Sequence, residues 1–229
     1  GLDVGLVAHA GPTEVPTVDA LDKTIGHCDV VIDFTAPDVS SSHARQCAVR
    51  GIPIVIGSTG FSPYQNGLLY EASKRIALVV APNMSIGVNL MIEVAVEMAR
   101  RLGSHFDIEI SETHHRHKKD APSGTALRLA DELARARGRD TDDVRCARVG
   151  HVGDRPLHEI GVQSHRGGDV VGDHSVFFLG DGERIELTHR AANRDQFARG
   201  ALRAARWIID RSPGLYDMSH VLNDREAQA

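Results

Sequence analysis

The amino-acid sequence predicts an α/β protein whose first part is an open parallel sheet and whose second part mixes strands and helices. Three short, almost continuous apolar runs in the first part are typical of strands that are buried on both faces of a parallel sheet. They are residues 30–34, 52–57 and 76–80. The segments between these runs, residues 40–50 and 63–75, have the length of helices that connect parallel strands.

The ends of the three predicted strands favour a ligand site. Ligands of open parallel sheets bind beyond the carboxyl ends of the strands, because the loops of neighbouring strands meet there. The end segments of this chain are also typical of ordinary turns and helix caps, but three of them are expected to converge on one crevice. The candidate binding residues are Phe34, Thr35, Gly57, Ser58, Thr59, Ala81, Pro82, Asn83 and Met84.

The pattern changes after Asn83. Asn89 is predicted to cap a helix whose apolar residues recur at helical spacing as far as Leu102, and a strand is predicted at residues 106–110. Alternating and helical patterns continue towards the end of the chain. They predict strands at residues 160–164, 175–179 and 184–189 and a last helix at 197–209.

Residues 112–126 contain a dense group of titratable side chains. From His114 to Lys118 every side chain is cationic or can carry a proton near neutral pH, so a bound anion would relieve the repulsion among them. A helix is predicted directly afterwards, with Ser123 or Thr125 as its N-cap, and the free N–H groups of a helix start bind carboxylate or phosphate. An exposed basic run is often only solvated charge, but this one precedes a helix start, which favours an anion-binding site.

The composition describes an ordinary globular protein. The 229 residues are 41% hydrophobic and 25% charged, and the formal net charge of -5 argues against general nucleic-acid binding. No apolar stretch approaches the ~20 residues of a membrane-spanning helix, so no membrane partner is expected. The three cysteines are widely spaced and include no C-x-x-C pair, which predicts reduced thiols and a cytoplasmic location.

The run E-T-H-H-R-H-K-K-D-A-P-S-G-T-A at residues 112–126 resembles the E-x-H-H-x-x-K-x-D-A-P-S-G-T-A motif of the dihydrodipicolinate reductase family, and the similarity extends from about Val4 to Leu222. The resemblance implies a Rossmann-type dinucleotide-binding domain at residues 1–85 and 195–229. It implies a mixed α+β domain at residues 86–194 that binds substrate and forms a homotetramer. Such enzymes use NADH or NADPH to reduce the dehydrated form of 4-hydroxy-tetrahydrodipicolinate, a cyclic imine dicarboxylate, to tetrahydrodipicolinate in the diaminopimelate route to lysine.

The resemblance also implies roles for residues of the motif. By matching positions, His114 is the proton donor or acceptor and Lys118 is a second proton donor. His115 matches a contact with a substrate carboxylate. Gly124 and Thr125 match donors to the carboxylate at the helix start. No residue is expected to bind a metal ion.

The strand ends match the cofactor contacts of the family. Residues 57–59 correspond to a G-T-T contact with the nicotinamide cofactor, and residues 81–84 to the segment along the nicotinamide and its ribose. One part of the family pattern is not found, because residues 1–8 resemble the second strand of the family and no G-x-G-x-x-G or G-x-x-G-x-x-G motif occurs before them. The chain does not begin with Met, so we expect that an N-terminal segment is omitted. The predicted second strand ends near His9 alone, which leaves the choice between NADH and NADPH open.

Two other classes of function remain as alternatives. A zinc site could use His115 and His117 with His114 and Glu112, although the neighbouring cationic side chains would repel a metal ion. An anion-binding module would keep the dicarboxylate site but bind no dinucleotide.

The other histidines are scattered, and most of them are expected at the surface or in ordinary packing. They are His9, His27, His43, His105, His151, His158, His165, His174, His189 and His220. Residues 166–168 and 169–174 are expected instead to line a mobile loop near the substrate.

Overall fold

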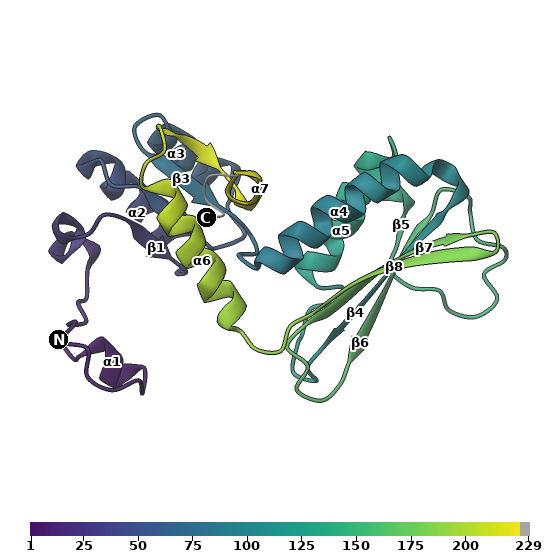
Figure 1. Cartoon of the computed structure of the whole chain (residues 1–229), viewed down its shortest axis with the longest axis horizontal. Helices are drawn as coiled ribbons and strands as arrows, with labels where there is room; N and C mark the ends of the chain where they lie inside the picture. The colour runs from purple at the N-terminus through teal and green to yellow at the C-terminus, as the bar shows by residue number, and fades with distance from the viewer. Residues whose placement is uncertain (225–229) are drawn as a thin grey trace. The chain divides into compact units, whose positions relative to one another are not determined.

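The computed structural model describes residues 1–224 and divides the chain into two compact units. The first unit is Gly1–Pro82 with Ala201–Ala229, and the second is Asn83–Gly200 (Figure 1). The chain enters the second unit after Pro82 and returns to the first within helix α6 (Asp195–Ile208). The sequence analysis placed these two boundaries after residues 85 and 194, whereas the structure places them after Pro82 and Gly200.

A four-stranded parallel sheet with the strand order β1-β2-β3-β9 forms the centre of the first unit. Its strands are β1 (Val31–Asp33), β2 (Ile54–Ile56), β3 (Ala77–Val80) and β9 (Gly214–Tyr216). The three predicted strands are confirmed, and all three residues of β2 are 0% exposed, as expected for a strand with two covered faces. Strand β9 was not predicted, because three residues give too little pattern.

Helices α2 (Pro37–Arg50) and α3 (Pro63–Ser73) connect these strands and confirm the predicted crossover helices. Helix α2 ends at Gly51, whose φ of 71° is a left-handed conformation that glycine adopts without strain. Helix α3 begins with a capping box in which Ser62 and Gln65 satisfy each other's backbone N–H groups. The two helices bury residues such as Cys47 and Leu69 against the sheet. Each buried side chain of leucine size contributes roughly 1.5–3 kcal/mol.

The beginning of the chain differs from the prediction. Residues 1–8 were expected to form a strand, but Val4–Val7 form a short helix, α1. The carboxylate of Asp3 accepts hydrogen bonds from the N–H groups of Leu6, Thr13 and Glu14, which fixes a helical turn and the loop after it. A short apolar run is compatible with either a strand or a helix, and here the cap decides.

Several further elements complete the first unit. Two 3-10 turns, η1 (Leu21–Lys23) and η2 (Ile25–His27), precede β1. Helix α6 confirms the predicted last long helix, and its residues Ala201, Ala204 and Ile208 are buried. Helix α7 (Met218–Asn223) follows β9 and is capped by Asp217. No helix within residues 1–224 has both the length and the apolar character needed to cross a membrane.

A five-stranded mixed sheet with the order β5-β6-β4-β7-β8 forms the centre of the second unit. Its strands are β4 (Asp107–His114), β5 (Val144–Arg145), β6 (Ile160–Arg166), β7 (Asp173–Gly180) and β8 (Glu183–Arg190). Strand β4 pairs parallel with β6 and antiparallel with β7, so the prediction of a mixed sheet is confirmed. Strand β4 runs four residues further than predicted, as far as His114, which places the titratable run at a strand end.

Helices α4 (Ile86–Leu102) and α5 (Gly124–Ala136) lie side by side and pack their apolar faces against the mixed sheet (Figure 1). Leu129 and Leu133 of α5 are 0% exposed and form one core with Phe178 of β7. The predicted cap of α4 was wrong, because Ser85 is the N-cap, while Asn89 is buried inside the helix and donates to the carbonyl of Asn83. Short 3-10 turns, η3 (Gly103–His105) and η4 (Thr141–Asp143), follow the two helices.

Candidate active site

Glu112 is the buried centre of residues 112–126, the predicted catalytic segment. Its side chain is 0% exposed, and the alternation of strand β4 points it towards the same interior as Ile108 and Ile110. Burial would raise the pKa of this carboxyl, but hydrogen bonds from Arg166 and then His114 outweigh burial and lower the pKa to about 2. Glu112 is therefore an ionised carboxylate throughout the physiological pH range.

Three groups surround the Glu112 carboxylate. Arg166 binds it with two parallel hydrogen bonds, Nη1 to Oε2 at 2.8 Å and Nη2 to Oε1 at 2.9 Å. The Ser123 N–H donates to Oε1 at 3.1 Å, and Nδ1 of His114 lies 2.6 Å from Oε2. One carboxylate thus connects the end of β4, the end of β6 and the start of α5.

His174 packs against His114 from the neighbouring strand. The two rings meet edge to face with centroids 5.2 Å apart, and Nε2 of His174 lies 3.0 Å from the hydroxyl of Ser123. His174 is 4% exposed, and burial, followed by the charge of His114, lowers its pKa to about 4. Burial also lowers the pKa of His189, which pairs with His174 across β7 and β8. Both rings are therefore uncharged near neutral pH.

These positions correct part of the sequence analysis. Arg166 and His174 were expected in a mobile loop, but Arg166 is the last residue of β6 and His174 is the second residue of β7. His174 is also not a surface histidine, because strand pairing places it directly opposite Glu112. The role of Glu112 as the shared partner was missed, because its arginine partner lies far along the sequence.

The loop that carries Lys118 is tied to the loop between β6 and β7. The Arg116 N–H donates to the carbonyl of Gly168 at 3.2 Å, and the Gly167 N–H donates to the carbonyl of His114 at 3.0 Å. Nζ of Lys118 donates to Oδ2 of Asp120 at 2.9 Å. The backbone bonds fix the loop after His114, and the bond to Asp120 fixes the ammonium group of Lys118 within that loop.

Within residues 1–224, several polar atoms that were predicted to bind carboxylate have no protein partner. Nδ1 of His115 is buried and has no hydrogen-bond partner among the described residues. Ser123 is the N-cap of α5 and accepts from the Ala126 N–H at 3.2 Å, which settles the choice between Ser123 and Thr125. Within residues 1–224 the N–H groups of Gly124 and Thr125 donate to no protein acceptor. The first turn of α5 is thus open to an anion.

The surroundings of Gly124 and Thr125 also leave the start of α5 accessible to a ligand. A Cβ atom on Gly124 would meet no heavy atom within 4 Å, so the backbone there is freely accessible. The hydroxyl of Thr125 accepts from Nδ2 of Asn83 at 3.2 Å. A predicted substrate residue and a predicted cofactor residue are therefore in direct contact within the second unit.

In the first unit the ends of β1 and β2 are joined by a network that the sequence analysis missed. Oδ1 of buried Asp33 accepts from the Thr35 N–H at 2.9 Å and from the Ser40 hydroxyl at 2.8 Å. Ser40 in turn lies 2.7 Å from the hydroxyl of Ser58, and His43 lies 2.6 Å from Oδ2 of Asp33. Burial opposes ionisation of Asp33, but these hydrogen bonds together lower its pKa. The network fixes two predicted cofactor residues, Thr35 and Ser58.

The remaining predicted cofactor residues differ in accessibility. Phe34 is 53% exposed, and its ring covers Gly57 so closely that a Cβ atom there would lie 2.3 Å from Phe34 Cε1. Thr59 and Pro82 are exposed, whereas Ala81 is 1% exposed and its N–H is bonded to the carbonyl of Ile56 at 3.1 Å. Met84 is also 1% exposed, which leaves its side chain no surface for a ligand.

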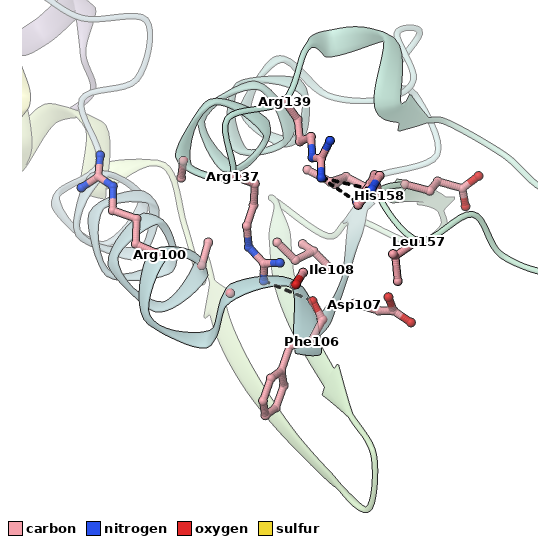
Figure 2. Close-up of a pocket in the computed structure, with 14 residues that line it drawn as sticks. Arg100, Phe106, Asp107, Ile108, Arg137, Arg139, Leu157 and His158 are labelled. Atoms are coloured by element: carbon pink, nitrogen blue, oxygen red, sulfur yellow. Dashed lines mark hydrogen bonds between the residues drawn. The ribbon is translucent and has the colours of Figure 1, made fainter.

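A cavity of about 250 Å³ lies where α4 and α5 end and β4 begins, and Figure 2 shows the residues that line it. Arg137 reaches from the end of α5 to the carbonyl of Phe106 at 3.1 Å, and Arg139 contacts His158. Positive side chains at helix C-termini offset the partial negative charge of the free carbonyl groups. His114 lies at the far end of β4, about 23 Å away at ~3.3 Å per residue. The cavity is therefore separate from the catalytic segment.

The zinc alternative finds no support in the geometry. Across residues 1–224, no group of three or more His, Cys, Asp and Glu side chains is arranged to hold a metal ion. The rings of His115 and His117 have centroids 6.3 Å apart, and Nδ1 of His114 is already bonded to Glu112.

A parallel sheet with polar strand ends, and a second unit with a histidine beside an open helix start, are typical of two-unit oxidoreductases of the dinucleotide-binding α/β class. Comparison with family models narrows this class. The model described as "Dihydrodipicolinate reductase, N-terminus" matches residues 1–84, and "Dihydrodipicolinate reductase, C-terminus" matches residues 87–222. The chain belongs to the dihydrodipicolinate reductase family.

Individual relatives support the same family. The 4-hydroxy-tetrahydrodipicolinate reductase of Myxococcus xanthus (strain DK1622) is 58% identical over 224 residues, which cover 97% of this chain and 83% of the relative. The enzyme of that name from Anaeromyxobacter dehalogenans (strain 2CP-1) is 51% identical over 226 residues, with coverage of 98% and 84%. The solved structure of dipicolinate-bound dihydrodipicolinate reductase from Paenisporosarcina sp. TG-14 matches with a TM-score of 0.74 at 28% identity, and covers 95% of this chain and 84% of that chain.

Proposed function

We propose that this chain reduces the dehydrated form of 4-hydroxy-tetrahydrodipicolinate to tetrahydrodipicolinate, in the diaminopimelate route to lysine, with NADH or NADPH as the hydride source. One observation carries the proposal. The Glu112 carboxylate contacts both His114 at the end of β4 and the Ser123 N–H at the start of α5. It thereby holds a proton-carrying ring beside an open helix start, and reduction of an anionic imine needs both groups.

Hydride transfer creates the need for a nearby proton donor. A bound nicotinamide would supply a hydride to the conjugated C=C–C=N system, and a proton would take up the electron pair that the hydride displaces. His114 is proposed to provide that proton, because its ring is mostly buried and only its Nδ1 is bound by Glu112. Lys118, held by Asp120, is proposed as the second donor.

The two substrate carboxylates are proposed to bind at the start of α5 and at His115. The N–H groups of Gly124 and Thr125 are open, and the positive end of the helix dipole adds to their attraction for an anion. The partnerless Nδ1 of His115 supports a polar ligand at that position, because a buried polar atom without a partner costs free energy.

The dinucleotide is proposed to contact the strand ends of the first unit. The exposed ring of Phe34 and the hydroxyl of Thr59 offer an apolar face and a hydrogen-bonding group, which fit a nucleotide ring and a ribose or carboxamide. The proposed contacts on this unit are Phe34, Thr35, Gly57, Ser58, Thr59, Ala81 and Pro82. Asn83 of the second unit keeps its predicted role, whereas the buried side chain of Met84 supports packing.

The proposal extends to a homotetramer and to a cytoplasmic location. The mixed sheet carries helices α4 and α5 on one face, and within residues 1–224 no helix of the second unit covers the other face. That uncovered face supports assembly with further copies of the chain. The free thiols of Cys28, Cys47 and Cys146 support a reducing compartment. Light scattering tests the assembly and should give four times the chain mass of 24.8 kDa.

The experiment that tests the proposed activity is steady-state kinetics of wild type and His114→Gln. The substrate would be generated in place, and consumption of NADH or NADPH would be followed by absorbance. Loss of general acid-base catalysis should lower kcat by about 100- to 10,000-fold while the Kd for NADH, measured by fluorescence, stays the same. The matched control is His165→Gln, because His165 is an exposed histidine on the neighbouring strand β6.

Two outcomes would contradict the proposal. A wild-type chain that binds pyridine-2,6-dicarboxylate but neither dinucleotide would be an anion-binding module. Equal losses of kcat and of NADH affinity in His114→Gln would assign His114 to folding or cofactor binding.

A further inference from the structure

We propose that Glu112 and Arg166 form a positioning pair for the reaction: Glu112 fixes the His114 ring so that Nε2 exchanges the proton, and Arg166 cancels the charge of Glu112 beside the carboxylate site. The inference rests on the proposed function and adds two residues to it. Neither side chain is assigned a contact with the reacting atoms, so both act through His114 and the start of α5.

The protonation pattern follows from the contacts of Glu112. An ionised carboxylate can only accept hydrogen bonds, so the hydrogen between Glu112 and His114 belongs to Nδ1 of the ring. The neutral ring then has its lone pair on Nε2, and the protonated ring donates from Nε2. A Cβ atom on Gly172 would lie 3.0 Å from Nε2, so the glycine leaves room for the ring in this orientation.

Packing holds the ring in that orientation. His114 is 12% exposed, and the edge of the His174 ring meets it with centroids 5.2 Å apart. His174 is uncharged near neutral pH because of its burial, so it can pack against a protonated His114 without repelling it strongly. The ring therefore changes charge without changing its partners.

Arg166 neutralises the negative charge that Glu112 places beside the start of α5. Oε1 of Glu112 accepts from the Ser123 N–H, one residue before the open N–H groups of Gly124 and Thr125. An uncompensated negative charge at this place would repel a substrate carboxylate. Arg166 binds both oxygens of Glu112, and its Nη2 also donates to the carbonyl of Asp120 at 2.6 Å. Because the charges of Glu112 and Arg166 cancel, the start of α5 keeps the positive potential of its N–H groups.

The arrangement predicts what Glu112→Gln does to the ring. A glutamine oxygen at the position of Oε1 keeps the bonds from Ser123 N–H and Arg166 Nη2. The glutamine NH2 then takes the position of Oε2 and faces Nδ1 of His114, so the ring must accept there and carry its hydrogen on Nε2. In this orientation the NH2 group faces one donor, Arg166 Nη1. The opposite orientation would set it against two donors, the Ser123 N–H and Arg166 Nη2. A neutral ring of that tautomer cannot accept a proton at Nε2.

A set of four variants tests the pair by kinetics. Glu112→Gln should lower kcat by roughly 100- to 10,000-fold, the range seen when an orienting carboxylate is removed from a histidine, with the NADH Kd unchanged. Arg166→Met should mainly raise KM, because the charge of Glu112 is left beside the carboxylate site. The double variant Glu112→Gln/Arg166→Met should regain the wild-type KM but keep the low kcat. Ser111→Ala is the control, since Ser111 precedes Glu112 on β4 and, within residues 1–224, its hydroxyl bonds only to exposed His165.

The double variant also guards against a failure to fold. Removing one member of a buried pair leaves an uncompensated charge or donor, whereas removing both is often tolerated. Thermal unfolding should therefore place the double variant above the less stable of the two single variants. A double variant with wild-type kcat, or Glu112→Gln with wild-type kcat, would overturn the positioning role.

Nitrogen NMR of histidine-labelled protein separates this inference from the proposed function. The spectrum of the wild-type chain should show His114 with hydrogen on Nδ1, and Glu112→Gln should move that hydrogen to Nε2. This measurement needs no substrate and no turnover. A wild-type chain that shows hydrogen on Nδ1 but reduces no imine would refute the function alone, whereas a neutral wild-type ring with hydrogen on Nε2 and none on Nδ1 would refute the pair.

Discussion

His174 provides a prediction whose size can be worked out from the structure. The ring is 4% exposed, and burial, followed by the charge of His114, lowers its pKa from 6.5 to about 4. Between these values the unfolded chain binds a proton that the folded chain does not, so the folded state loses stability as pH falls. The contribution is complete above pH 6.5 and is lost near pH 4, and at ~1.4 kcal/mol per unit the total is about 3 kcal/mol.

The perturbation is His174→Gln, which removes the titrating ring but keeps a polar group towards the Ser123 hydroxyl. The charged and titratable groups around the ring, His114, Glu112, His189 and Lys118, stay in place. The wild type should be more stable than the variant near pH 7, because the ring fills a packed site. This advantage should shrink by about 2.5 kcal/mol between roughly pH 7 and pH 4.5, since only the wild type has this group to protonate.

Urea unfolding followed by far-UV circular dichroism at several pH values measures the difference. His165→Gln serves as the control, because it removes an exposed histidine from the neighbouring strand β6 and should lack the trend. A difference in the free energy of unfolding that stays constant across this pH range would refute the reasoning. It would mean that the folded protein accepts a proton on His174 as easily as the unfolded chain does.

Three further predictions address the cap, the strand ends and the thiols. Ser123→Ala should cost about 1 kcal/mol of unfolding free energy through loss of the N-cap, measured by urea unfolding. Gly57→Ala should weaken NADH binding in fluorescence titration, because its Cβ would lie 2.3 Å from the Phe34 ring and displace it; unchanged affinity would remove Phe34 from the cofactor site. A thiol reagent should modify exposed Cys146 and spare Cys47 in the native protein, because burial raises the pKa of Cys47 to about 12, and mass spectrometry distinguishes the two.

The fold could be predicted from the sequence wherever a local pattern was long enough. Strand β2 has three apolar residues in succession, and α5 begins after a capping serine and repeats apolar residues at helical spacing. Several elements were not predictable in this way, and β9 and α1 show why. Strand β9 has only three residues, and α1 depends on Asp3 bonding to Thr13 and Glu14, a contact that no local pattern reveals.

The candidate site was only partly predictable, because half of it is created by strand pairing. The motif at residues 112–126 contains Glu112, His114 and Ser123, so its chemistry could be inferred from one short segment. Arg166 and His174 lie more than 50 residues further along and reach Glu112 only because β4 pairs with both β6 and β7. The register is what matters, since His114 lies opposite Arg166 on one side and Glu112 lies opposite His174 on the other.

That register explains how one segment can serve both proton transfer and anion binding. A carboxylate orients a histidine by accepting from Nδ1–H, yet its negative charge is unfavourable beside a substrate with two carboxylates. Burial of Glu112 alone would not solve this, because burial favours the protonated form, which could no longer orient the ring as an ionised acceptor. The guanidinium of Arg166 removes both difficulties at once, because it keeps Glu112 ionised and neutralises it at the helix start. The central strand of the mixed sheet is the position from which one carboxylate can reach His114, Arg166 and Ser123 together.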